Sequence, residues 1–211
     1  MTAAKPATRS KRAQRRDEAR ARILSIVERQ LRDGEAFADL SVGRIVAEAG
    51  ISRTTFYVYF EDKTDLLRMW YADVTDEIID AAQGWWTLDA TVTRPKVRSA
   101  LERIVQAYRP HPELMAATHE ATGYDQGVRE IVQSAMQRYI VGLTEHLKSG
   151  QGDGFVDPSL PAEETSCWLQ WMAERGLHRM GQVADEREIG RLVDAYAGIV
   201  WNTLYAPMKA R

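Results

Sequence analysis

Residues 40–60 read LSVGRIVAEAGISRTTFYVYF, and no other part of the sequence is as informative about the fold. Two short segments flank Gly50, which allows a left-handed turn, and Ser52 is placed to cap the second segment. In both segments the apolar residues recur at the spacing of a single helix face: Val42, Ile45, Val46, Ala49, Phe56 and Phe60. The stretch therefore has the pattern of a helix-turn-helix.

The second of these helices is the predicted DNA reader. Arg53, near its start, can reach O6 and N7 of a guanine in the major groove, a pairing that discriminates by roughly 1–3 kcal/mol. Thr54 can contact a thymine methyl group. Groups that can contact phosphates are the hydroxyls of Thr55, Tyr57, Tyr59 and Ser41 and the ammonium of Lys63. Short helix pairs also occur in helical enzymes and bundles, where the same side chains are only solvated surface.

The distribution of charge favours the DNA interpretation. The 211 residues carry a net charge of -2, but residues 1–60 hold 12 basic and 7 acidic side chains, while residues 61–211 hold 16 and 23. Residues 1–16 are predicted to be a basic, flexible arm that attracts phosphates or enters the minor groove. The basic residues up to position 22 are Lys5, Arg9, Lys11, Arg12, Arg15, Arg16, Arg20 and Arg22.

Elsewhere the chain repeats apolar residues at helical spacing, and no segment alternates as a strand does. An all-α fold of about nine helices is predicted, with a DNA-binding domain at 17–62 and a ligand-binding and dimerisation domain at 63–211. Expected helices in the second domain end near Gly84, Tyr108, Thr122 and Gly150, and two more span about 161–180 and 186–205. The glycine-rich residues 150–154 are predicted to be a flexible connector.

Several classes of site are not expected. Cys167 is the one cysteine, so no internal disulfide is possible, and a reducing compartment, the cytoplasm, is predicted. No apolar run approaches the ~20 residues of a membrane helix. Enzyme motifs are missing, and neither a metal nor a cofactor is expected. The histidines are scattered without i, i+4 pairing: His111, His119, His146 and His178.

The stretch from residue 17 to 70 resembles the TetR family of bacterial one-component transcription regulators. The resemblance rests on the helix that ends at Gly34, on the helix-turn-helix stretch itself, and on Phe37, Lys63, Leu66 and Leu67. The C-terminal part is similar to the ethionamide-resistance-repressor branch of that family. The matching residues there are Met136, Gln137, Trp171, Met172, Ala173, Glu174, Arg175 and Trp201.

The resemblance implies a homodimer that pairs mainly through its last two helices, binds double-stranded DNA and holds a small molecule in its C-terminal part. The implied DNA contacts are Ser41, Gly43, Arg44, Arg53, Thr54, Thr55, Tyr57, Tyr59 and Lys63, where Gly43 can contact DNA only through its backbone. The implied ligand-binding positions are Tyr108, Met136, Tyr139, Gln170, Trp171, Glu174 and Trp201.

The residues of the C-terminal part support such a pocket but leave an alternative open. All six tryptophans lie beyond residue 61, together with Met115, Met136 and Met172, which suits an adaptable apolar lining or an ordinary core. Gln170 and Glu174 are spaced i, i+4, so they share one helix face. They can orient a ligand, face water together, or leave Glu174 to pair with an arginine of its own helix.

The sequence as a whole predicts a ligand-responsive transcriptional regulator, most simply a repressor that a small apolar or amphipathic effector releases from a palindromic operator. Activation instead of repression stays open. Two other classes fit some of the features: a helical enzyme that acts on an apolar substrate in a tryptophan-rich pocket, and an architectural DNA-binding protein without an effector.

Overall fold

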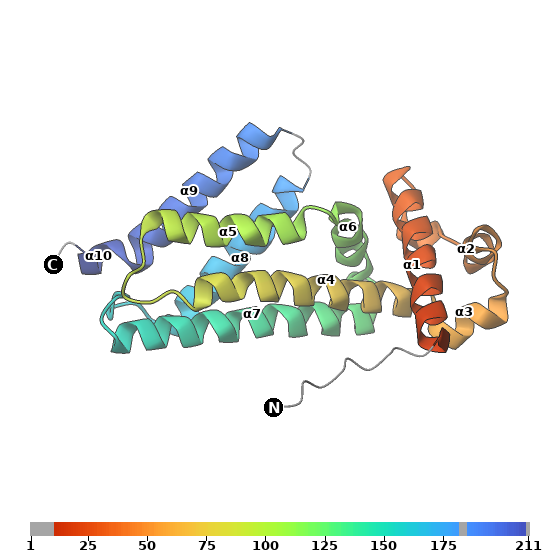
Figure 1. Cartoon of the computed structure of the whole chain (residues 1–211), viewed down its shortest axis with the longest axis horizontal. Coiled ribbons are helices and arrows are strands. Elements are labelled where there is room, and N and C mark those ends of the chain that lie inside the picture. The colour runs from red at the N-terminus through yellow and green to blue at the C-terminus, as the bar shows by residue number, and fades with distance from the viewer. Residues whose placement is uncertain (1–10, 182–184, 210–211) are drawn as a thin grey trace, which may run out of the picture. The chain divides into compact units, whose positions relative to one another are not determined.

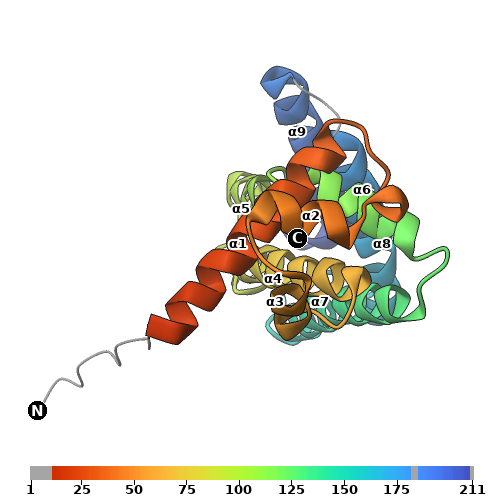
Figure 2. The same ribbon diagram turned by 90° about the vertical axis from the view of Figure 1, so that its right-hand side faces the viewer.

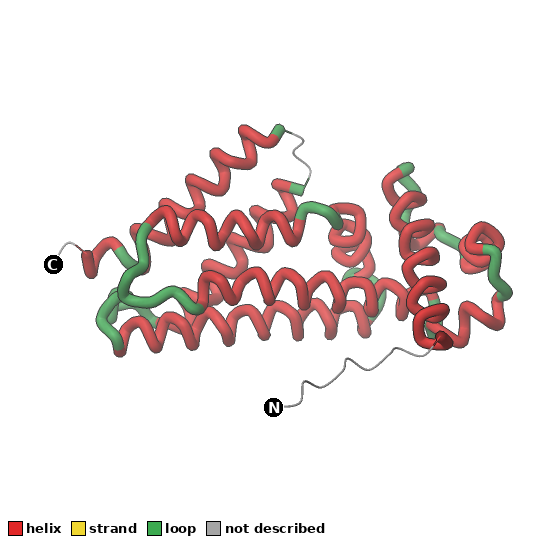
Figure 3. Tube along the Cα trace, in the orientation of Figure 1, coloured by secondary structure: helices red, strands yellow, loops and turns green. Residues whose placement is uncertain are grey.

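The computed structural model describes residues 11–181 and 185–209, and over these residues the protein is helical throughout (Figures 1 and 3). They form ten α-helices and one short 3-10 helix, and none of them lies in a strand. The chain divides into two compact units, unit 1 up to Trp70 and unit 2 from Tyr71 onward. The predicted all-α class is confirmed.

Unit 1 consists of three helices and the first turns of a fourth. α1 (Lys11–Arg32) leads through η1 (Phe37–Asp39) to α2 (Val42–Ala49), α3 (Arg53–Tyr59) and the start of α4 (Lys63–Trp86). α2 packs against both α1 and α3 (Figure 2). The buried core of the unit contains Ile23, Val27, Phe37, Leu40, Ile45, Phe56, Phe60, Leu66 and Leu67.

The turns of unit 1 follow the sequence prediction. Gly34 (φ 92°) and Gly50 (φ 66°) both adopt the left-handed conformation, which a side chain would disfavour. Ser52 has an extended backbone, and its Oγ accepts a hydrogen bond from the Thr55 amide at 3.0 Å. The helix-turn-helix is therefore bounded by the residues that define it in the sequence.

Both ends of this domain differ from the prediction. α1 begins at Lys11, so residues 11–16 of the predicted arm are helical, and residues 1–10 lie outside the described part. At the other end unit 1 extends eight residues beyond Asp62. The reason is that the first two turns of α4 contribute Leu66, Leu67 and Trp70, all buried, to unit 1.

Unit 2 is a helical bundle in which α7 packs along α8 and α5 along α9 (Figure 1). Besides the later turns of α4 it contains α5 (Arg94–Tyr108), α6 (Pro112–Ala121), α7 (Gln126–Gly152), α8 (Ala162–Met180), α9 (Glu186–Leu204) and α10 (Ala206–Lys209). Thr93, Asp125 and Asp185 cap α5, α7 and α9 through their side-chain oxygens. The helix boundaries agree with the predicted ones to within a few residues, and α10 was not predicted.

The segment 150–154 is not the flexible connector that was expected. α7 continues through Gly152, and Gly150 is buried where Phe155 and Val156 fold back on the helix. A Cβ at position 150 would lie 2.4 Å from the Val156 side chain, so this glycine serves close packing. Only Gly154, with φ 78°, forms the turn.

A hydrogen-bonded chain joins three elements at this end of unit 2. The Trp85 indole donates to the Tyr205 hydroxyl at 2.9 Å, and that hydroxyl lies 2.8 Å from Nε2 of His146. Nδ1 of His146 lies 2.9 Å from the Trp86 carbonyl, which can only accept, so Nδ1 carries the proton and Nε2 accepts from Tyr205. Burial lowers the pKa of His146, and the bond to Trp86 opposes this only in part. The chain therefore holds a neutral imidazole in the core.

Candidate functional site

The outer face of α3 presents the residues predicted to read DNA. Arg53, Thr54 and Tyr57 are exposed, while Phe56 on the opposite face is completely buried and anchors the helix. Thr55 is half-buried, and its hydroxyl lies 2.9 Å from that of Ser52. Packing thus separates the two faces of this seven-residue helix as the apolar spacing predicts.

Arg53 occupies a position that depends on Gly43. A Cβ built at position 43 would lie 2.7 Å from Nη2 of Arg53, so the guanidinium rests where a side chain of α2 would otherwise stand. Arg53 is nonetheless exposed, and no residue in the described part of the chain forms a hydrogen bond or ion pair with it. Its five N–H donors are available to an external partner.

One exposed residue of α3 was missed from the sequence. Val58 has 72% of its surface exposed, next to Tyr57 at 56%. Tyr59, by contrast, is half-buried. An apolar side chain at this exposure buries little surface within the described part of the chain. Val58 extends the predicted surface toward the C-terminal end of α3.

Two of the predicted contacts on α2 already have partners within the protein. The Ser41 hydroxyl accepts a hydrogen bond from the Arg44 amide at 3.1 Å and so caps the helix. The Arg44 guanidinium forms an ion pair with Glu35. Both residues are exposed, so these local bonds orient them at the surface.

Lys63, a predicted phosphate contact, has partners within unit 1. Its Nζ lies 2.7, 2.7 and 2.9 Å from the carbonyl oxygens of Phe37, Ala38 and Leu40, and 5.0 Å from the centroid of the Phe37 ring. An ammonium has three N–H donors, and these carbonyls can accept all of them. Lys63 therefore ties the start of α4 to η1. Partners 23 to 26 residues away cannot be read from local sequence.

Part of the basic N-terminal region is also bound internally. Arg22 donates to the Ala49 carbonyl at 3.3 Å, across the interface between α1 and the end of α2. Arg16 is exposed. Lys5 and Arg9 lie outside the described residues.

Unit 2 contains a small cavity that collects five of the seven predicted ligand positions. Its volume is about 70 Å³, and α4, α5, α6, α7 and α8 all contribute to its wall. The predicted residues in its lining are Tyr108, Met136, Tyr139, Gln170 and Glu174. The sequence reasoning missed Tyr71, Thr75, Ile78 and Ile79 of α4, which line it as well. The other lining residues come from four different helices, so local spacing in the sequence could not show that these four face a common cavity.

The two remaining predicted ligand positions, Trp171 and Trp201, do not line this cavity. Trp171 is 50% exposed and packs edge-on against Trp168, with 5.2 Å between ring centroids. It follows Gln170 by one residue, about 100° around the helix, so it cannot share the inward face of Gln170 and Glu174. Trp201 packs against Tyr205, with 5.8 Å between the two ring centroids.

A second, larger cavity of about 260 Å³ lies between α5, α7, α8 and α9. Its wall is almost entirely apolar, and it shares Tyr139 and Leu177 with the smaller cavity. Arg179 is the charged residue of its lining. In both cavities the lining formed by the described residues contains tyrosine and methionine side chains but no tryptophan.

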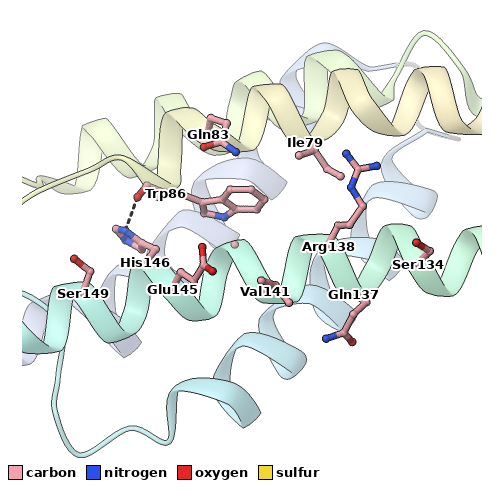
Figure 4. Close-up of a pocket in the computed structure, with 11 residues that line it drawn as sticks. Ile79, Gln83, Trp86, Ser134, Gln137, Arg138, Val141, Glu145, His146 and Ser149 are labelled. Carbon is pink, nitrogen blue, oxygen red and sulfur yellow. Dashed lines mark hydrogen bonds between the residues drawn. The ribbon is translucent and has the colours of Figure 1, made fainter.

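An open groove of about 710 Å³ runs between α4 and α7 (Figure 4). The Trp86 ring lies against Gly142, where a Cβ would approach it to 2.6 Å. Arg138 reaches toward α4, where it pairs with Asp76 at 2.8 Å, whereas Gln137 points away. The groove is shallow and mixed in polarity, and it contains none of the predicted ligand positions.

Comparison with known proteins agrees with both units. Residues 30–69 match the bacterial regulatory proteins of the tetR family, and residues 97–206 match the C-terminal domain of the transcriptional regulator EthR. The second match alone covers half of the chain. The protein belongs to the TetR family.

Similar proteins within the TetR family include curated transcriptional regulators. The HTH-type transcriptional regulator EthR of Mycolicibacterium smegmatis is 28% identical over 175 residues, which are 81% of this chain and 77% of that protein. EthR of Mycobacterium tuberculosis is 29% identical over 156 residues, 74% of this chain and 72% of that one. These relatives are regulators and not enzymes, and the TetR-family chain described here is a DNA-binding transcriptional regulator.

Solved structures share the fold of this TetR-family protein. A TetR-family regulator from Syntrophomonas wolfei superposes with a TM-score of 0.71 at 16% identity, covering 90% of this chain and 98% of that one. A transcriptional regulator from Saccharomonospora viridis in complex with choline gives a TM-score of 0.66 at 18% identity, covering 90% and 98%. Among the described helices none is long and apolar enough to cross a membrane.

Proposed function

We propose that the protein is a homodimeric repressor that binds a palindromic operator and is released from it by a small amphipathic effector. The observation that carries the DNA part is the outer face of α3. Arg53 is exposed there without a hydrogen-bond partner among the described residues, and Phe56 anchors the helix on its buried side. Arg53 would pair with a guanine, and Thr54, Tyr57 and Val58 would add methyl and hydroxyl contacts. The proposed backbone-oriented contacts are Ser41, Gly43, Arg44, Thr55 and Tyr59.

The proposed dimer interface is the apolar surface that α8 and α9 expose. Large apolar side chains there include Trp168, at 64% exposure, and Trp171, Met172, Leu192 and Ile199. The last three also line the larger cavity, so the proposed interface would border the opening of that cavity. Contiguous exposed apolar residues on neighbouring helices indicate a protein interface. A two-fold pair formed in this way would present α3 twice, at half-sites about 34–36 Å apart on the DNA.

The proposed effector site is the pair of cavities in unit 2. A structural relative holds choline, which supports a small-molecule site in this fold. α4 supplies Tyr71, Thr75, Ile78 and Ile79 to the smaller cavity and Lys63 and Leu66 to unit 1, so one continuous helix serves both units. Shifting a 1:99 mixture of two conformers to 99:1 requires about 5.5 kcal/mol of differential ligand binding. An effector must therefore distinguish the two conformers, because tight binding alone is insufficient.

Selection of bound sequences from random duplex DNA tests the proposal directly. A two-fold symmetric site with a guanine in each half is expected, and a candidate effector should then release the full-length protein from it. Enrichment of sequences without symmetry, or an unchanged operator affinity at saturating effector, would contradict the corresponding part of the proposal.

A further inference from the structure

Glu174 is a carboxylate with no ion-pair partner among the described residues. It lies on the inward face of α8 and lines the smaller cavity of unit 2. No described residue forms an ion pair or a hydrogen bond with it, although Arg175 and Arg179 follow on the same helix. Glu174 is therefore not paired with an arginine of its own helix. A partly buried anion of this kind provides a strong preference for a cationic ligand.

The rings around Glu174 strengthen this preference. Tyr71, Tyr108 and Tyr139 line the same cavity. Burial is the main cause that raises the pKa of Tyr71 and of Tyr108, and the negative charge of Glu174 raises both further. The field of the carboxylate thus reaches both hydroxyls. An ammonium group placed here would be attracted by the carboxylate and would lie among tyrosine side chains, whose rings and hydroxyl oxygens both favour a cation.

The sizes of the two cavities define the rest of the ligand. The smaller one, at about 70 Å³, has room for a head group, because a water molecule occupies roughly 30 Å³ in the liquid. The larger one, at about 260 Å³, has an apolar lining that suits a hydrocarbon chain. Tyr139 and Leu177 line both, so they form the partition between them. A ligand that occupies both spaces requires a side chain of this partition to change rotamer.

We infer that the effector is an amphipathic amine, with its ammonium group at Glu174 and its apolar chain in the cavity between α5, α7, α8 and α9. This inference rests on the proposed function, in which unit 2 binds the effector, and it adds the chemical class. A fatty acid is the opposite case: its carboxylate would be repelled by Glu174 and would have to bind through Arg179 at the wall of the larger cavity.

Two other glutamates of α8, Glu163 and Glu164, provide a comparison for Glu174. Glu163 and Glu164 line a hollow beside Trp168 and Trp171, so carboxylates and aromatic rings occur there too. Glu163, however, already pairs with Lys148 at 2.7 Å, and both glutamates are exposed to water, where ionic attraction is weak. Glu164 is therefore a control for Glu174 on the same helix.

Three ligands of equal chain length test the inference on the full-length protein. Calorimetric titration at pH 7 with n-octylammonium, 1-octanol and octanoate separates charge from chain. We expect octylammonium to bind about ten- to a hundredfold more tightly than octanol, the range of a charge-assisted bond, and octanoate to bind more weakly than either. Glu174→Gln should remove the advantage of the ammonium and leave octanol within about twofold. Glu164→Gln should change neither.

The outcomes distinguish the inference from the function. Retained octanol binding in Glu174→Gln shows that the cavity is intact, so a lost ammonium preference is then due to the charge. Equal affinities for ammonium and alcohol, equal losses for both in Glu174→Gln, or octanoate binding that Arg179→Gln abolishes would each overturn the inference. If octanol releases the operator and octylammonium does not bind, the regulator stands and the amine fails. If octylammonium binds through Glu174 without affecting operator affinity, the site stands and the effector-released repressor fails.

Discussion

The DNA-binding surface of unit 1 and the cavity of unit 2 are built in opposite ways. The surface consists of consecutive residues on one short helix, presented outward by a single buried anchor, Phe56. The cavity combines residues from five helices, from Tyr71 to Leu177. A local surface depends on one helix staying folded, whereas a composite cavity depends on how a whole bundle packs. Substitutions in the two regions should therefore have separable effects.

The largest effect is expected from removing the anchor of α3. Phe56→Ala should lower the free energy of unfolding by about 3–5 kcal/mol, because a fully buried aromatic side chain leaves a cavity in a small core. DNA binding should be lost, while octylammonium binding to unit 2 persists. Denaturant titration followed by circular dichroism and calorimetry measures both. Val58→Ala, in the same helix but exposed, is the control, and loss of ligand binding in Phe56→Ala would show that the units are not separable.

A smaller effect is expected from the proposed reader. Arg53→Ala should reduce discrimination at one base pair per half-site by roughly 1–3 kcal/mol and leave stability unchanged, since the guanidinium has no partner in the described part of the chain. Competition binding with singly substituted operators reports this. Arg32→Ala, an exposed arginine at the end of α1 that pairs with Glu28, should not change base preference. An intact preference in Arg53→Ala would assign the reading to other residues.

Gly43→Ala should separate the stability of unit 1 from its recognition of DNA. Alanine favours a helix over glycine by up to about 1 kcal/mol, so the melting temperature should stay the same or rise. The added Cβ would displace the Arg53 guanidinium, and the preference at its base pair should weaken or change. Gly152→Ala, at an exposed helix position with nothing within 4 Å, should leave recognition unaltered. Unchanged preference in Gly43→Ala would mean that Arg53 adopts another rotamer on DNA.

The smallest effect concerns the core of unit 2. Because burial lowers the pKa of His146, the unfolded state binds a proton near the usual value of 6.5 while the folded state does not. The contribution of His146 to the free energy of unfolding should therefore be fully present above this pH and should decrease as the pH falls below it. Asp89 and Glu163 have lowered pKa values, and their contribution is lost only below their usual values of about 4.

Denaturation midpoints at pH 7.5 and 5.5 isolate the histidine from these carboxylates. His119→Gln, which replaces an exposed histidine, should keep the difference between the two midpoints, and His146→Gln should reduce it. A difference that persists in His146→Gln would have to come from another group.

The helix-turn-helix was predictable because its signals are short in range. Gly50 and Ser52 act on their immediate neighbours, and Phe56 and Phe60 share a face through helix geometry alone. The inward direction of Gln170 and Glu174 follows from the same spacing once one of them is buried. Trp171 lies outside the smaller cavity, and resemblance between sequences does not fix which face of α8 is turned inward.

The helices, their turns and the outward face of α3 could be predicted from the sequence alone, since they depend on residues within about four positions of one another. Other contacts depend on tertiary packing. Lys63 binds carbonyl groups of η1, and Arg53 occupies the space above Gly43. Residues of α4 complete the cavity that Glu174 lines. Each of these outcomes needs a partner from a distant part of the chain. Only packing determines which of several solvent-facing or inward-facing choices such a side chain adopts.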